Sequence, residues 1–165
     1  MKRYLIYIAA LLLAVGCTTP PPQPAEPTIY VSIAPLRSLA EAITEQDFPV
    51  EVLVPAGASP ENFELSPKQY IALNEAQWLF STGLIEFELA LVDKLPSQEK
   101  VIDLSRGIEL LAGTCSHAHH GHNHAHGIDP HIWTSPRALK TMSENLFHAI
   151  RERYPDSVRY AQNFN

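Results

Sequence analysis

Apolar and polar positions follow two kinds of pattern along residues 29–165. Short apolar runs rich in β-branched residues predict buried strands, and apolar residues three or four positions apart predict amphipathic helices. The predicted strands span residues 29–33, 50–54, 78–81 and 101–104. The predicted helices begin at Pro35, Ser66-Pro67, Glu86 and Ser135-Pro136. Strands that alternate with helices predict an α/β fold, a parallel β-sheet flanked by helices with right-handed crossovers.

The helix starts carry recognisable signals. Proline is tolerated in the first turn of a helix, and a serine before it can accept a hydrogen bond from a first-turn N–H. Ser66-Pro67 and Ser135-Pro136 meet both conditions, and Pro35 meets the first. The apolar residues that carry the helical patterns are Leu36, Leu39, Ala40, Ile43, Ile71, Leu73, Ala76, Leu139, Met142, Leu146 and Ile150.

Residues 1–17 have the pattern of an export signal. Two basic residues precede an apolar run of twelve residues, Tyr4 to Val15, which is too short to span a bilayer comfortably. The run leads through small residues into Cys17, which resembles the bacterial lipobox and makes Cys17 the predicted lipidation site. The alternatives are an uncleaved anchor or an ordinary secretory signal. The mature protein is predicted to be extracytoplasmic, in the periplasm or at the cell surface, and held to a membrane by acyl chains.

The composition of the rest of the chain narrows its partners. Residues 18–28 are rich in proline and predict a semi-rigid linker, which leaves residues 29–165 as one domain of ordinary size. Loss of the two leader cations takes the net charge from −6 to −8, with histidines neutral. This acidic balance argues against nucleic acid and is compatible with cations. With Cys17 lipidated, Cys115 is either an additional soft metal ligand or a loop thiol.

Histidines are concentrated in one stretch. Neutral imidazole suits zinc, copper and nickel, so a dense run of histidines indicates metal binding. Small and polar spacers without apolar periodicity predict a mobile surface loop that binds metal in no fixed geometry. The alternatives are an expression tag, which the internal position disfavours, or a solvated linker. The predicted loop ligands are His117, His119, His120, His122, His124 and His126.

Two further residues are candidate ligands with a defined position. His131 lies between Pro130 and the apolar pair Ile132-Trp133, which we expect to anchor it in a core. Glu61 lies in the long loop after the second predicted strand. Both loops follow the carboxyl ends of predicted parallel strands, where open α/β folds bind ligands. The alternative for Glu61 is a solvent-exposed carboxylate, because most isolated glutamates lie at the surface.

Several ordered motifs carry a family resemblance. The motifs are the loop 54–67 (Val-Pro-Ala-Gly-Ala-Ser-Pro, then an aromatic and Ser-Pro), 102–108 (Ile-Asp-Leu-Ser-Arg-Gly-Ile), 129–136 (Asp-Pro-His-Ile-Trp, then Ser-Pro) and 160–163 (Tyr-Ala-Gln-Asn). Together they resemble the extracytoplasmic metal-binding proteins of ABC importers for zinc and manganese. The histidine-rich stretch before Asp129-Pro130-His131 is similar to that of the zinc-specific members.

The resemblance implies a two-lobed protein whose lobes are joined by a long helix, with metal in the cleft between them. It places the ligands of the first lobe at Glu61 and His131. Pro60-Glu61 departs from the family's usual Pro-His pair, but carboxylate oxygen also binds zinc. The chain reaches Asn165 about where the connecting helix is expected to start. Residues 29–165 are therefore predicted to be the N-terminal lobe, in a fragment or a truncated product.

The predicted function is zinc capture for an ABC importer, by a monomer whose partners are the membrane permease and its ATPase. Zinc is the predicted ligand, with manganese as the alternative. A stand-alone surface metal scavenger or adhesin is a second alternative. No catalysis is expected, because a zinc hydrolase needs three protein ligands, a metal-bound water and a general base. The sequence contains no His-Glu-x-x-His motif that would supply them.

Overall fold

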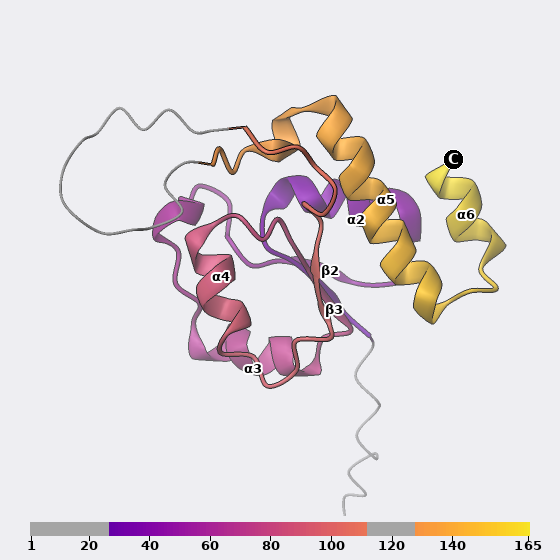
Figure 1. The fold of residues 1–165 in the computed structure, drawn as a ribbon. Coiled ribbons are helices and arrows are strands. Elements are labelled where there is room, and N and C mark those ends of the chain that lie inside the picture. The colour runs from indigo at the N-terminus through magenta and orange to yellow at the C-terminus, as the bar shows by residue number, and fades with distance from the viewer. Residues whose placement is uncertain (1–26, 112–127) are drawn as a thin grey trace, which may run out of the picture.

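The structure, a computed structural model, describes residues 27–111 and 128–165 (Figure 1). The predictions for the leader with Cys17, for most of the linker, for Cys115 and for the six-histidine run lie outside the described residues. Within the described ranges, no helix is long and apolar enough to cross a membrane.

A four-stranded parallel sheet forms the centre of the domain, as predicted. Its strands are β1 (Ile29–Val31), β2 (Val50–Val52), β3 (Trp78–Ser81) and β4 (Val101–Asp103), in the order β2-β1-β3-β4. The first two predicted strands are each two residues too long, because residues 32–33 and 53–54 leave the ladder as bends while staying buried. The order places the reversal of winding between β1 and β3, so β2 and β4 are the edge strands.

Helices cover both faces of the sheet, as the alternating pattern predicts. Figure 1 shows α3 and α4 on one face and α2, α5 and α6 on the other. The helices are α2 (Ala34–Thr44), α3 (Pro67–Glu75), α4 (Glu86–Val92), α5 (Pro136–Arg153) and α6 (Val158–Phe164). Two 3-10 turns, η1 (Pro60–Asn62) and η2 (Ile132–Thr134), were not predicted, and both lie in the candidate ligand loops.

The predicted caps form at α3 and α5. The Ser66 hydroxyl accepts from the Gln69 N–H at 3.4 Å, and the Gln69 side chain accepts from the Ser66 N–H at 2.9 Å, which completes a capping box. The Gln69 amide also donates to the Leu53 carbonyl at 2.9 Å, so the start of α3 is fixed to the end of β2. The Ser135 hydroxyl accepts from the Ala138 N–H in the same way.

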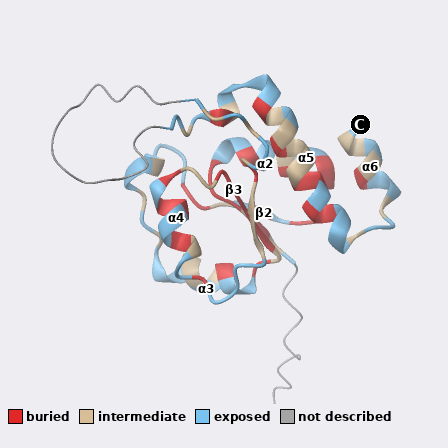
Figure 2. Cartoon of the chain, viewed as in Figure 1, coloured by how far each residue is buried: buried red, intermediate tan, exposed pale blue. Residues whose placement is uncertain are grey.

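The core lies between the sheet and the inner faces of the helices, shown red in Figure 2. Its fully buried apolar side chains come from β1 and β3 and from α2 to α5. They include Ile29, Leu36, Leu73, Leu79, Phe80, Leu91, Met142, Leu146 and Ile150. Ile71 is an exception among the apolar helix residues, because it points to solvent on α3 with 64% of its surface exposed.

A buried carboxylate holds the turn that follows β3. Glu88 is 2% exposed and accepts four hydrogen bonds from the turn. Its donors are the Thr82 N–H and hydroxyl, at 3.0 and 2.7 Å, and the N–H groups of Leu84 and Ile85, both at 3.2 Å. The turn also needs Gly83, whose φ is +66° and whose missing Cβ would lie 2.8 Å from the Asp103 carboxyl. Glu88 therefore stabilises the passage from β3 into α4.

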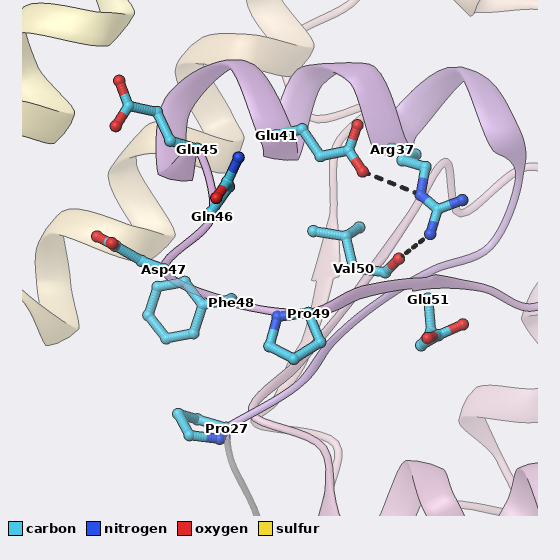
Figure 3. A pocket seen from close by; sticks show the side chains of 10 residues that line it. All are labelled: Pro27, Arg37, Glu41, Glu45, Gln46, Asp47, Phe48, Pro49, Val50 and Glu51. Atoms are coloured by element: carbon cyan, nitrogen blue, oxygen red, sulfur yellow. Dashed lines mark hydrogen bonds and ion pairs between the residues drawn. The ribbon is translucent and has the colours of Figure 1, made fainter.

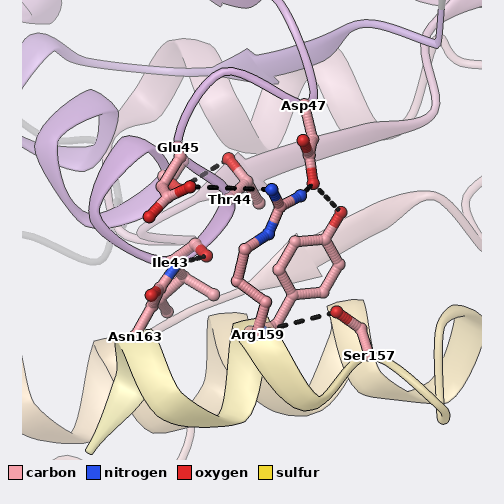
Figure 4. A network of polar contacts seen from close by, with 9 residues as sticks. Ile43, Thr44, Glu45, Asp47, Ser157, Arg159 and Asn163 are labelled. Atoms are coloured by element: carbon pink, nitrogen blue, oxygen red, sulfur yellow. Dashed lines mark hydrogen bonds and ion pairs between the residues drawn. The ribbon is translucent and has the colours of Figure 1, made fainter.

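Helix α6 is attached to the end of α2 by polar contacts (Figure 4). The Tyr160 hydroxyl donates to Asp47 at 2.7 Å, the Asn163 amide donates to the Ile43 carbonyl at 3.0 Å, and Arg159 pairs with Asp47 and Glu45. The Phe164 ring stacks on Phe147 of α5 with 4.5 Å between centroids. These contacts order a seven-residue helix that is too short to be stable alone.

The free edge of β2 is partly covered by α2. The Arg37 guanidinium donates to the outward-facing Val50 carbonyl and pairs with Glu41 at 3.1 Å (Figure 3). Because β2 pairs with β1 through Pro49, Glu51 and Leu53, the carbonyl of Val50 has no partner within the sheet. Arg37 supplies that partner from a side chain.

Candidate metal centre

The two candidate ligand loops leave the same edge of the sheet. The loop with Glu61 follows β2 and the segment with His131 comes after β4, and the carboxyl ends of parallel strands meet at one edge. Two strands, β1 and β3, lie between β2 and β4. At roughly 4.8 Å per strand spacing, the loop after β2 must cross the sheet edge before Glu61 can approach His131.

The loop after β2 makes this crossing through local turns and one aromatic contact. Gly57 has a φ of +84° in the turn in which the Ala58 N–H donates to the Pro55 carbonyl. Phe63 then packs edge-on against Phe87 at the start of α4, with 5.3 Å between centroids. Because α4 connects β3 to β4, this contact carries η1 and Glu61 from the β2 edge toward the β4 side.

Glu61 itself is exposed on η1. Its backbone N–H donates to the Ser59 hydroxyl at 3.3 Å, which fixes the turn. Among the described residues no hydrogen bond or ion pair holds its carboxylate, so the carboxylate is available to a cation but is not directed by a neighbour.

His131 is held much more firmly. One oxygen of Asp129, Oδ1, lies 3.0 Å from the His131 backbone nitrogen and 2.7 Å from its ring Nδ1. The Trp133 ring lies 5.1 Å from the imidazole, tilted by 56°. The His131 carbonyl accepts from the Thr134 N–H and hydroxyl, at 3.1 and 2.8 Å. As expected, Ile132 is buried and Trp133 packs against the core.

Electrostatics favour the charged form of Asp129. The backbone N–H of His131 and then its side chain stabilise the carboxylate, which lowers the pKa of Asp129 below its ordinary value. Asp129 is therefore ionised at neutral pH. Its pairing with His131 is exposed, since 54% of the His131 side-chain surface is accessible, and it leaves the ring open to an incoming metal.

A hollow of about 590 Å³ lies beside His131. Its polar lining consists of Glu109, Asp129, His131, Thr134, Ser135, Arg137 and Thr141. Glu61 does not line it, so the structure does not place the two candidate ligands in one preformed site. Within residues 27–111 and 128–165, no group of three histidine, cysteine, aspartate or glutamate residues is arranged to hold a metal ion. Another hollow, about 910 Å³ and lined by Pro27, Glu41 and Phe48 among others, lies on the amino-terminal side of β1 and β2 (Figure 3).

The histidine-rich stretch is joined to the fold next to His131. The Asp129 N–H donates to the Leu111 carbonyl at 3.0 Å, so the residues that flank the stretch are hydrogen-bonded to each other. Leu111 and Ile128 are both exposed at this base, at 72% and 42%. The two described residues that flank the stretch are therefore close to the candidate ligand, because Ile128 is three residues before His131 and Leu111 is hydrogen-bonded to Asp129.

Asp129 is the residue of the site to which the sequence assigns no role. The sequence could have indicated this contact, because an aspartate side chain commonly accepts a hydrogen bond from the backbone N–H two residues further along the chain. Sequence reasoning treats Asp129 only as the extended residue before Pro130, whereas the structure makes it the partner of the ligand.

Known proteins resemble this chain in sequence and in fold. Residues 29–165 match the model of the ZnuA family, described as the periplasmic component A of a zinc-uptake complex. The chain belongs to this family. The family is one of uptake components and not of enzymes, in agreement with the expectation that no catalysis occurs.

Relatives by sequence are named for zinc. The high-affinity zinc uptake system protein ZnuA of Haemophilus ducreyi is 31% identical over 175 residues, covering 92% of this chain and 54% of the relative. The zinc-binding protein AdcA of Streptococcus pyogenes serotype M3 is 29% identical over 154 residues, covering 82% of this chain and 29% of the relative. The chain spans less than a third to about half of these relatives.

Solved structures agree on the fold. A crystal structure of ZnuA superposes with a TM-score of 0.71 and 32% identity, covering 84% of this chain and 51% of that one. Zn(II)-bound AdcA from Streptococcus pneumoniae superposes with a TM-score of 0.70 at 22% identity, covering 85% of this chain and 29% of that one. The α/β fold predicted for the N-terminal lobe is thereby confirmed.

Proposed function

We propose that this chain captures zinc outside the cytoplasm for an ABC importer, as the N-terminal lobe of a solute-binding protein. The family match over residues 29–165 carries the proposal. Relatives at about 30% identity are named for zinc, which favours zinc over manganese. The importer's permease and ATPase are the proposed partners.

We propose His131 as the ligand that this lobe positions best and Glu61 as a second ligand. His131 lies at the carboxyl edge of the sheet, is fixed by Asp129, and lines a hollow. Glu61 is carried toward the same side by the Phe63–Phe87 contact. Zinc sites take about four ligands, so two protein ligands leave positions for other donors.

The experiment that tests this function is growth under metal limitation. Deletion of the gene is expected to impair growth of its bacterium when zinc is chelated, and added zinc should restore growth. Restoration by manganese and not by zinc would favour the manganese alternative. Unimpaired growth together with loss of surface-bound zinc would favour the stand-alone scavenger.

The histidines at positions 117, 119, 120, 122, 124 and 126 are proposed to bind additional zinc. Deleting residues 117–126 should leave the fold intact, because the stretch has no apolar residue larger than alanine and the hydrogen bond between Asp129 and Leu111 lies outside it. Calorimetry should show fewer zinc ions per chain, with an unchanged circular dichroism spectrum. A length-preserving variant with serine at the six histidines is the matched control and should lose the same zinc. Unchanged stoichiometry in both variants would contradict the proposal.

The proposed organisation before the lobe is a lipoprotein signal over residues 1–17 and a linker over residues 18–28. Replacing Cys17 by serine should release the protein from membranes or leave it unprocessed, because the thiol is the acylation site. Labelling with radioactive palmitate followed by membrane fractionation measures both effects. The Cys115→Ser variant is the control and should label as the unaltered protein does; palmitate label on the Cys17→Ser variant would exclude a lipid anchor at this residue.

A further inference from the structure

The arrangement around His131 carries information about which ring nitrogen is available. Oδ1 of Asp129 contacts two nitrogens of His131. It accepts a hydrogen bond from the backbone N–H at 3.0 Å and lies 2.7 Å from ring Nδ1. An ionised carboxylate can only accept hydrogen bonds. The short contact therefore requires that Nδ1 carries the proton, which leaves the lone pair of the neutral ring on Nε2.

Neighbouring groups restrict rotation of the His131 ring. The backbone of His131 is fixed by its own hydrogen bond to Asp129 and by the two donors of Thr134 to its carbonyl. The Trp133 ring lies against the imidazole at 5.1 Å. Rotation about the side-chain bonds would break the contact at Nδ1 and would have to clear the Trp133 ring.

We propose that Asp129 is a positioning residue for metal binding. Asp129 holds the neutral ring of His131 in the Nδ1–H form, so that Nε2 alone is presented to a divalent cation. The proposal rests on the proposed role of His131 as a ligand. Carboxylates that accept from the second nitrogen of a metal-binding histidine fix its tautomer and increase its basicity as a ligand. Because Oδ1 of Asp129 contacts His131 twice, the proposal assigns Asp129 the holding of the ring and no bond to the metal.

The tautomer can be read without any metal. In the full chain with ¹⁵N-labelled histidine at about pH 8.5, where histidine side chains in general are neutral, long-range ¹H–¹⁵N correlations identify the protonated nitrogen. The His131 signals are those lost in His131→Ala. We expect Nδ1–H in the unaltered chain and in Asp129→Asn, whose amide oxygen still accepts. Asp129→Ala should shift His131 to the Nε2–H form that predominates in an imidazole without such an acceptor.

Zinc titration of the same samples tests the consequence for the metal. Zinc sulfate should perturb the His131 signals of the unaltered chain, and Asp129→Ala should require about 10–100 times more zinc for the same effect. Asp156→Ala removes an equal charge from an exposed loop residue and should change neither result.

The outcomes distinguish the positioning role of Asp129 from the ligand role of His131. An Nδ1–H signal that persists in Asp129→Ala would overturn the positioning role, as would a shifted tautomer with unchanged zinc sensitivity at His131. If zinc leaves His131 unperturbed in the unaltered chain, His131 is no ligand and the proposed function fails at this residue. The tautomer comparison decides separately whether Asp129 selects the ring form.

Discussion

Replacing Glu88 by glutamine is expected to lower the free energy of unfolding by about 2–4 kcal/mol. The side chain is 2% exposed, and its two oxygens accept from four donors in the turn after β3. Glutamine has nearly the same shape but replaces one acceptor by an NH₂ group that faces N–H and O–H donors. At least one donor of the turn is then buried without a partner, and the turn loses the charge that strengthened its hydrogen bonds.

Urea denaturation of Glu88→Gln measures this effect. The matched control is Glu86→Gln, an exposed glutamate in the same first turn of α4, which should change stability by no more than about 0.5 kcal/mol. Equal stabilities for the two variants would show that Glu88 is not what fixes the turn.

Zinc binding by residues 18–165 alone is expected to be weak and distributed over several sites. This lobe offers Glu61 and His131, which the structure does not bring into one hollow, and its described residues contain no group of three ligands. Water must complete the shell of any zinc held there, which lowers affinity and selectivity. The six histidines of the run can chelate, but each arrangement costs the entropy of ordering the chain that carries it.

Competition with a chelator of nanomolar affinity measures this expectation. The isolated chain should fail to remove zinc from the chelator at one-to-one stoichiometry, and deletion of residues 117–126 should remove most of the weak binding. One-to-one competition that His131→Ala abolishes would show a complete site within this lobe.

The sequence predicts the architecture better than it predicts contacts. The four strands and the helices α2 to α5 follow from local patterns and, at α3 and α5, from serine–proline starts, which depend directly on the backbone. The order β2-β1-β3-β4 does not, since it depends on which face each crossover helix covers. Helix α6 was also not predicted, because it is held in place by hydrogen bonds from Tyr160 and Asn163 to residues more than 100 positions earlier.

The candidate metal centre was likewise predicted only in part from the sequence. Glu61 and His131 are candidate ligands because of the motifs that contain them, and the Ile132-Trp133 anchor follows from its apolar pair. Their relative placement depends on a contact between Phe63 and Phe87, which no local pattern indicates. Nothing in the helical pattern that begins at Glu86 singles out Glu88, and only the turn folded over it shows that it is buried.

The Arg37 contact at β2 has a consequence for self-association. An exposed edge strand is a template on which another chain can add a strand. Here the edge is three residues long, carries the charged Glu51, and has its Val50 carbonyl taken by a guanidinium. A second copy would have to displace Arg37 and separate it from Glu41 before pairing could begin. This edge is therefore closed to growth into larger sheets, and the protein can be concentrated in solution without polymerising through β2.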